Sequence, residues 1–181
     1  NRKGFFMKNE IYKNIFTLTG KKALIPGGTG GLGSAIARAF LQNGADVAVC
    51  GGHPDKAACL EEEAKQAGRS FLSLRCDIRD REDVAEMLDQ VDKSFGRIDI
   101  LVNSAGMNRL LPAEDYDENT FDQVMDLNVK GIHTVTRAVG KRFMIPNQYG
   151  RIVNLSSVKS FIGAKQDYIA YCTSKGAVNM Y

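Results

Sequence analysis

Short apolar runs separated by segments of helical periodicity constrain the fold of this chain more than any other feature. Five runs are rich in Val, Ile and Leu, and they cover Lys22–Pro26, Asp46–Cys50, Ser70–Arg75, Ile98–Asn103 and Arg151–Leu155. Continuous apolar runs are typical of strands buried on both faces, and their alternation with helices indicates βαβ units. The pattern predicts an α/β fold built on a doubly wound parallel sheet.

The length and composition fit one globular domain. At 181 residues, with 25% charged and 44% apolar residues, the chain is long enough for a sizeable core and too apolar for a disordered chain. Its 24 basic and 21 acidic side chains are scattered, so no basic tract indicates a nucleic-acid partner. Because no apolar stretch approaches the ~18 residues of a membrane span, and no signal-peptide pattern opens the chain, we expect a cytoplasmic protein without a membrane partner.

Cysteine and histidine spacing gives no sign of a disulfide framework or a metal centre. The cysteines at positions 50, 59, 76 and 172 form no C-x-x-C pattern, so free thiols are predicted. Neither His53 nor His133 has a second ligand at helix or loop spacing. No metal site is therefore expected.

Two amphipathic helices are predicted between the strands. One has an apolar stripe from Val84 to Phe95, with Asp80 and Asp83 as acidic residues at its start. The other is longer, carries a stripe from Phe121 to Val139, and ends before Pro146. Two irregular segments, 106–119 and 158–167, follow the carboxyl ends of strands, where an open α/β sheet binds its ligands.

A glycine-rich segment follows the first expected strand directly. It reads G-G-T-G-G-L-G over Gly27–Gly33, and small residues then open a helix. Glycine permits close backbone approach, and the free amides at a helix start favour the pyrophosphate of a dinucleotide. A tight turn without a ligand, or a site for S-adenosylmethionine, are the alternatives to this interpretation.

The cofactor preference depends on the end of the second strand, about 20 residues past the glycine loop. A carboxylate there normally binds the ribose hydroxyls of NAD, but this chain has Gly51 and Gly52. His53 and Lys56 are nearby, and no Arg is present in this segment. We therefore favour NADP(H) over NAD(H).

Tyr171 and Lys175 stand four residues apart, so on a helix they share one face. An ammonium beside a phenol favours the ionised form, which suits a phenol that exchanges protons near neutral pH. A solvated pair on a helix surface is the alternative.

Five separated elements occur together in the order found in the short-chain dehydrogenase/reductase family, which the chain resembles from Thr19 to Tyr181. The elements are Gly27-x-x-x-Gly31-x-Gly33, Asn103-Ser104-Ala105-Gly106, Asn128, Ser157 and Tyr171-x-x-x-Lys175. The resemblance implies a Rossmann-like sheet in the order 3-2-1-4-5. It also implies an NAD(P)-binding domain over residues 19–181, preceded by an N-terminal extension over residues 1–18.

The same resemblance implies the site residues. Tyr171 would be the general acid/base, Ser157 would stabilise the substrate oxygen, and Lys175 would assist the phenol and hold the nicotinamide ribose. Asn128 would hold a water in a proton relay, against the alternative of a satisfied core amide. The residues expected to bind the cofactor are Gly27, Thr29, Gly30, Gly31, Leu32, Gly33, Asp77, Ile78, Asn103, Ala105, Gly106, Tyr171 and Lys175. Ordinary strand-end capping is the alternative for Asp77.

Three departures from the family pattern stand out. Pro26 replaces a usual Thr and removes a hydroxyl and a backbone donor, which puts bonding to the Asn103 segment in doubt. Ser104 replaces the second Asn of the usual N-N-A-G. The sequence stops at Tyr181, where family members continue through two more strands, so the C-terminal strands are expected to be missing. If Tyr181 is the terminus of the protein, we expect weak or absent turnover.

Similarity to gluconate 5-dehydrogenase-like enzymes and to 3-oxoacyl-[acyl-carrier-protein] reductases leaves two substrate classes open. These are a sugar acid or polyol, with Arg109 available for a carboxylate, and an acyl-carrier-protein thioester, with Lys141 and Arg142 available for docking. An exposed, solvated side chain is the alternative for each of these residues. We expect an NAD(P)-dependent oxidoreductase that forms a homodimer or homotetramer. A non-catalytic dinucleotide-binding protein is the second hypothesis, and a methyltransferase ranks last.

Overall fold

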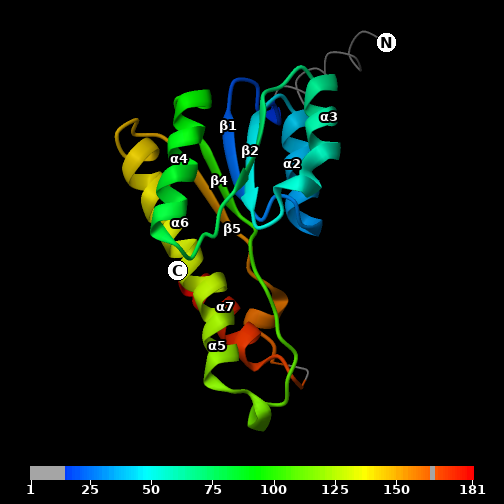
Figure 1. The fold of residues 1–181 in the computed structure, drawn as a ribbon, viewed down its shortest axis with the longest axis vertical. Coiled ribbons are helices and arrows are strands. Elements are labelled where there is room, and N and C mark those ends of the chain that lie inside the picture. Colours follow the sequence, from blue (N-terminus) through cyan, green and yellow to red (C-terminus); the bar gives the residue numbers. More distant parts are fainter. Residues whose placement is uncertain (1–14, 164–165) are drawn as a thin grey trace, which may run out of the picture.

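A computed structural model describes residues 15–163 and 166–181 of the chain. Most of the expected N-terminal extension, and two positions of the 158–167 segment, lie outside the described residues. Five parallel strands form one sheet in the order β3-β2-β1-β4-β5 (Figure 1). They are β1 Lys22–Pro26, β2 Asp46–Gly51, β3 Phe71–Arg75, β4 Ile100–Asn103 and β5 Arg151–Asn154. The predicted Rossmann-like sheet and its strand order are confirmed.

Helices cover both faces of the sheet, as Figure 1 shows. Helices α2 (Gly31–Gln42) and α3 (Ala58–Gln66) lie on one face, where an apolar cluster includes Ile25 and Val49. Helices α4 (Arg81–Phe95) and α6 (Ile132–Val139) lie on the other. β1, β2 and β4 are almost fully buried between the two helical layers, and their sequences are continuously apolar rather than alternating. The two edge strands differ from the prediction of burial on both faces, since β3 is mostly half-buried and β5 is mostly exposed.

Helix α4 begins where the acidic residues predicted it. The Asp80 carboxylate accepts hydrogen bonds from the backbone N–H groups of Glu82 at 2.7 Å and Asp83 at 3.3 Å. At the other end, Gly96 takes a left-handed conformation with φ of 70° and stops the helix. The helix thus has a local sequence signal at each end.

The longer helix differs from its prediction because it is not regular throughout. Helix α5 (Glu118–Met125) passes into a π-helical turn over Asp126–Gly131, then into α6, and a second π-helical turn covers Gly140–Met144. Gly131 lies in the first π turn against Ile78, where an added Cβ would be 2.8 Å from the Ile78 side chain. Helix periodicity alone predicts an unbroken α-helix, so the two turns were missed.

Helices α5 and α7 (Ile169–Met180) lie beyond the carboxyl ends of the strands, in the lower half of Figure 1. All four cysteines are free thiols, as predicted. Within the part of the chain that the structure describes, no helix combines the length and apolarity needed to cross a membrane.

Candidate active site

A cavity of about 1280 Å³ opens at the carboxyl ends of the strands. Its wall comes from the glycine loop after β1, the ends of β2 and β3, the loop after β4 and the start of α7. This is the edge where a doubly wound sheet is expected to bind ligands. The volume exceeds the ~300–1,000 Å³ of small-ligand pockets, so it has room for a large cofactor together with a substrate.

The glycine loop contains two kinds of glycine. Gly27 has a φ of +76°, and a Cβ there would lie 2.6 Å from the backbone nitrogen of Ala105. A Cβ on Gly33 would lie 2.2 Å from the carbonyl oxygen of Gly27. At Gly31, by contrast, a Cβ would meet no atom within 4 Å, although the residue lines the cavity. A side chain at Gly27 or Gly33 would collide with neighbouring backbone, so the loop is closely packed at these two positions. A side chain at Gly31 would meet no protein atom, so the loop has open space for a ligand there.

This open backbone fits the pyrophosphate of a dinucleotide. Gly31 begins α2, so the first amides of the helix have no partner one turn earlier and lie beside the open space. No charged side chain is required there, because the amides and the helix dipole favour an anion.

Ser104 restores the bonding that Pro26 put in doubt. Both its backbone N–H, at 3.1 Å, and its hydroxyl, at 2.7 Å, donate to the Pro26 carbonyl oxygen. Proline lacks an N–H but keeps its carbonyl, and Ser104 supplies two donors to it. The two departures from the family pattern therefore fit each other.

At the adenosine end expected for the cavity, Arg75 stands beside Gly51. The two residues are register partners on β3 and β2. A Cβ on Gly51 would meet nothing within 4 Å, and Arg75 is exposed and lines the cavity. Among the described residues Arg75 has no ion-pair partner. Arg75 is not among the site residues expected from the sequence, although it is the last residue of the third expected strand.

Asp77 lies two residues past the end of β3 and lines the cavity. Its backbone N–H donates to the Asp83 carboxylate at 3.0 Å, and its own carboxylate lies 2.5 Å from the Arg79 guanidinium. The hydrogen bonds from Arg79 hold the pKa of Asp77 below its usual value, although partial burial opposes them. Ile78 beside it is buried and also lines the cavity.

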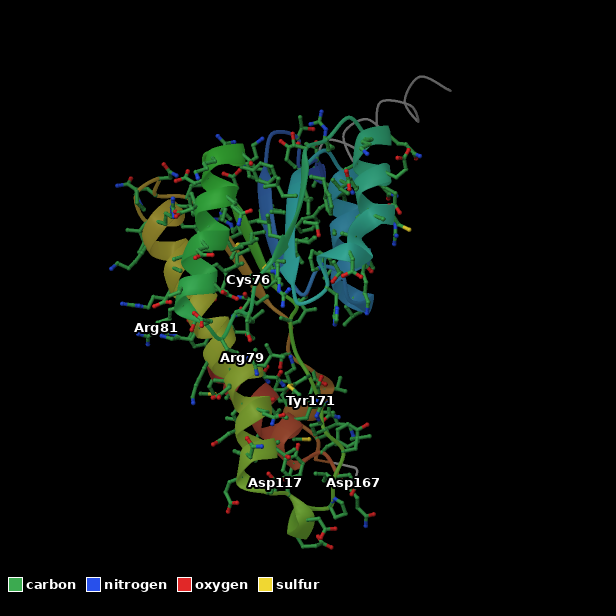
Figure 2. All side chains as sticks on the ribbon, viewed as in Figure 1. Cys76, Arg79, Arg81, Asp117, Asp167 and Tyr171 are labelled. Atoms are coloured by element: carbon green, nitrogen blue, oxygen red, sulfur yellow. The ribbon has the colours of Figure 1, made fainter. Side chains whose placement is uncertain are left out.

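Tyr171 and Lys175 meet at the far side of the cavity. Figure 2 shows Tyr171 beyond the strand ends, past Cys76 and Arg79. The Lys175 ammonium lies 5.7 Å from the centre of the Tyr171 ring and donates to the Leu155 carbonyl oxygen at 2.7 Å. Only 5% of Lys175 is exposed, and this burial lowers its pKa.

Two adjacent serines precede these residues on the cavity wall and differ in their partners. The Ser156 hydroxyl donates to the Lys175 carbonyl oxygen at 3.1 Å. The Ser157 hydroxyl oxygen accepts a bond from the Lys159 backbone N–H at 3.2 Å, which leaves its hydrogen available for another acceptor. Ser157 is therefore better placed than Ser156 to donate a hydrogen bond to a group bound in the cavity.

Two of the expected site residues do not line the cavity. The Asn103 amide donates to the Thr136 hydroxyl at 2.9 Å and to the Asn154 side chain at 2.8 Å, so it ties β4 to its neighbours. Asn128, fully buried in the first π turn, donates to the Ser174 hydroxyl at 2.9 Å and exchanges two bonds with the Met107 backbone. Its side chain holds the loop after β4, and its place in a proton relay stays a prediction.

The remaining expected site residues all line the one cavity: Gly27, Thr29, Gly30, Gly31, Leu32, Gly33, Asp77, Ile78, Ala105, Gly106, Ser157, Tyr171 and Lys175. His53 lines it as well, but Lys56 does not. At Gly106 the loop after β4 passes close to the buried side chains of Asn128 and Lys175. A Cβ on Gly106 would lie 3.3 Å from Asn128 Oδ1 and 3.6 Å from Lys175 Nζ.

Comparison with known proteins gives one consistent family. The model of the short chain dehydrogenase family matches residues 21–181. D-threitol dehydrogenase of Mycolicibacterium smegmatis is 38% identical over 163 residues, which cover 90% of this chain and 62% of the relative. The 2-dehydro-3-deoxy-D-gluconate 5-dehydrogenase of Escherichia coli is 36% identical, with coverage of 91% and 64%.

Solved structures agree with these relatives. A short-chain dehydrogenase/reductase from Mycobacterium marinum superposes with a TM-score of 0.86 at 34% identity, covering 91% of this chain and 67% of the other. NAD+-bound xylitol dehydrogenase gives 0.83 at 34% identity, with coverage of 88% and 61%. The chain spans 62–64% of the length of the first curated relatives that it matches.

Proposed function

The chain belongs to the short-chain dehydrogenase/reductase family, and from this premise we propose that it interconverts a secondary alcohol and a ketone by hydride transfer with an NAD(P) cofactor. The observation that carries the proposal is the convergence of Tyr171, Lys175 and Ser157 on one cavity with the open glycine loop. A phenol, an ammonium and a hydroxyl beside a phosphate-binding loop are the groups that carbonyl reduction requires.

Each group has a role that follows from its surroundings. When bound, the nicotinamide supplies or accepts the hydride. The Tyr171 hydroxyl donates its proton to the carbonyl oxygen during reduction and takes it from the alcohol during oxidation. The Ser157 hydroxyl donates a hydrogen bond to the same oxygen as that atom gains charge. Lys175, fixed by the Leu155 carbonyl behind the ring, stabilises the ionised phenol by its charge.

For the cofactor we propose NADP(H) over NAD(H). Gly51 presents no carboxylate to repel a 2′-phosphate, and Arg75 lies beside it in the sheet register, facing the cavity without an ion-pair partner among the described residues. Two comparison proteins carry NAD in their names, a glycerol dehydrogenase of Listeria innocua and the xylitol dehydrogenase. The preference for NADP(H) is supported by the residues at the end of β2 in this chain and not by the names of its relatives.

For the substrate we propose a small polyol or sugar acid. The named relatives act on compounds of both kinds. Docking of an acyl-carrier protein is less favoured, because Arg142 is held by Asp89 at 2.5 Å and Asp92 at 2.8 Å. Homodimer or homotetramer formation and a cytoplasmic location stay predictions from the sequence.

Substitution of Tyr171 by Phe tests the catalytic role. We expect turnover to fall at least tenfold while cofactor affinity stays within about twofold, because the phenol transfers a proton and does not hold the phosphates. Tyr149→Phe is the matched control, since Tyr149 does not line this cavity. Residual activity above about a tenth of the wild-type value would contradict the role of Tyr171.

Separate calorimetric titrations with NADPH and NADH test the cofactor preference. We expect tighter binding of NADPH, and we expect Arg75→Gln to weaken NADPH about tenfold while leaving NADH unchanged. Equal affinities in the wild type would overturn the preference. Binding of neither cofactor would overturn the proposed function as a whole.

A further inference from the structure

The carboxylates of the cavity wall lie at one end only, where Arg75 and Arg79 lie as well. The two carboxylates on its wall, Asp77 and Asp83, both lie near the end of β3, and one is held by Arg79. On the part of the wall away from β3, two cationic side chains besides Lys175 are present, Lys159 and Arg109. Among the described residues no carboxylate lines that side and neither cation has an ion-pair partner.

Lys159 is the better placed of the two cations. It lies in the single turn Val158–Ser160, is half-buried, and its ammonium is 4.6 Å from the centre of the Tyr168 ring. That ring is in turn 6.3 Å from the Tyr171 ring, edge to face. The ammonium is therefore held one aromatic side chain away from the phenol that is proposed to react.

The position of Lys159 is also fixed through its backbone. Its N–H donates to the Ser157 hydroxyl oxygen at 3.2 Å, so the backbone of Lys159 lies directly beside the proposed oxygen-stabilising hydroxyl. Partial burial of an ammonium costs solvation, and contact with a ring face offsets only part of that cost. An anion bound in the cavity would offset the rest.

Arg109 reaches the same side of the cavity from the loop after β4. The Tyr116 hydroxyl donates to the Arg109 carbonyl oxygen at 3.0 Å, which fixes the backbone of this exposed residue. A guanidinium can hold a carboxylate with two parallel hydrogen bonds. The loops after β4 and β5 thus each contribute one cationic side chain to the wall of the same cavity.

We propose that Lys159, with Arg109 as a second contact, binds the carboxylate of an anionic substrate, so that the enzyme acts on a sugar acid or its keto acid rather than on a neutral polyol. The inference rests on the proposed function and narrows its substrate class. A carboxylate at one end of a short hydroxylated carbon chain would occupy the cationic side while a carbon further along faces Tyr171 and Ser157.

The test compares two probes that differ at one terminal carbon. D-gluconate ends in a carboxylate, whereas D-glucitol ends in a hydroxymethyl group on an otherwise matched six-carbon chain. Binding of each to the full chain, saturated with the oxidised cofactor, is measured by saturation-transfer-difference NMR, which does not require turnover. We expect D-gluconate to bind about tenfold more tightly at low salt, since hydrogen bonds to charged groups are the stronger ones.

Two lysine variants locate the effect. We expect Lys159→Gln to remove most of the preference for D-gluconate without changing D-glucitol binding. Lys141→Gln carries the same charge change on a residue outside the cavity and should keep the preference. Raising the salt concentration should reduce the difference in affinity between D-gluconate and D-glucitol in the wild type and in Lys141→Gln, but not in Lys159→Gln.

The outcomes separate this inference from the proposed function. Equal binding of the two probes, no binding of D-gluconate, or a preference that survives Lys159→Gln in a protein that binds its cofactor would overturn the inference alone. Failure to bind either NADPH or NADH would overturn the proposed function and the inference with it.

Discussion

Single residues of the glycine loop differ in their surroundings, and substitution of Gly31 tests the proposed cofactor binding separately from stability. A side chain at Gly31 meets no protein atom within 4 Å, but it would stand in the cavity over the first amides of α2. We expect Gly31→Val to weaken NADPH and NADH alike by more than tenfold, with the free energy of unfolding changed by less than about 1 kcal/mol. Calorimetric titration and urea unfolding measure the two effects.

Gly33 gives the contrasting variant. Because a Cβ there would collide with the Gly27 carbonyl oxygen, Gly33→Ala should lower the free energy of unfolding by about 1–3 kcal/mol. Unchanged affinity for both cofactors in Gly31→Val would show that the loop is only a turn.

Burial of Lys175 makes the free energy of unfolding depend on pH. Burial lowers its pKa in the folded protein below the ordinary value, so between those two pKa values the unfolded chain binds more protons than the folded one. The contribution of Lys175 to stability therefore rises as the pH rises through this window. Lys175→Met removes the buried charge and this pH dependence together.

We accordingly expect Lys175→Met to lose turnover but to unfold at pH 7 with a free energy equal to or above that of the wild type, because a desolvated ammonium is replaced by an apolar chain. As the pH is raised from 7 toward 10, the free energy of unfolding of the wild type should rise relative to that of Lys175→Met. Urea unfolding at several pH values measures this shift, and a difference that is constant with pH would contradict it.

Among the secondary-structure elements, α4 is stabilised by the side chain at its start. Asp80 accepts from two backbone N–H groups that have no partner within the helix. Asp80→Ala should lower the free energy of unfolding by about 1 kcal/mol, as loss of an N-cap does. Glu86→Ala, an exposed change in the middle of the same helix, should have an effect below about 0.5 kcal/mol. Indistinguishable urea midpoints for the two variants would refute the cap assignment.

The strand order of the sheet determines where the cavity of the molecule lies. β2 and β3 lie on one side of β1, and β4 and β5 lie on the other, so the connections run in opposite directions from the centre of the sheet. The cavity lies at the carboxyl ends of the strands, and Gln123 of α5 and Tyr171 of α7 are among the residues that line it. This arrangement brings the glycine loop and Tyr171, about 140 positions apart in the sequence, to the same cavity.

Features that depend on local chemistry could be predicted from the residues alone. Apolar runs located all five strands to within two residues, and acidic residues located the start of α4. The glycine pattern and the i, i+4 spacing of Tyr171 and Lys175 indicated the two parts of the site. These signals are readable because strand burial, helix capping and helix-face spacing act between residues that are close in the chain.

Contacts between distant segments, by contrast, became visible only in the folded protein. It turned Asn103 and Asn128 inward to hold the framework, set Arg75 beside Gly51, and matched the Ser104 donors to the Pro26 carbonyl. It also introduced the π turns and brought Lys159 against the Tyr168 ring. Such contacts depend on strand register and on packing between distant segments, and a single sequence carries no periodic signal for either.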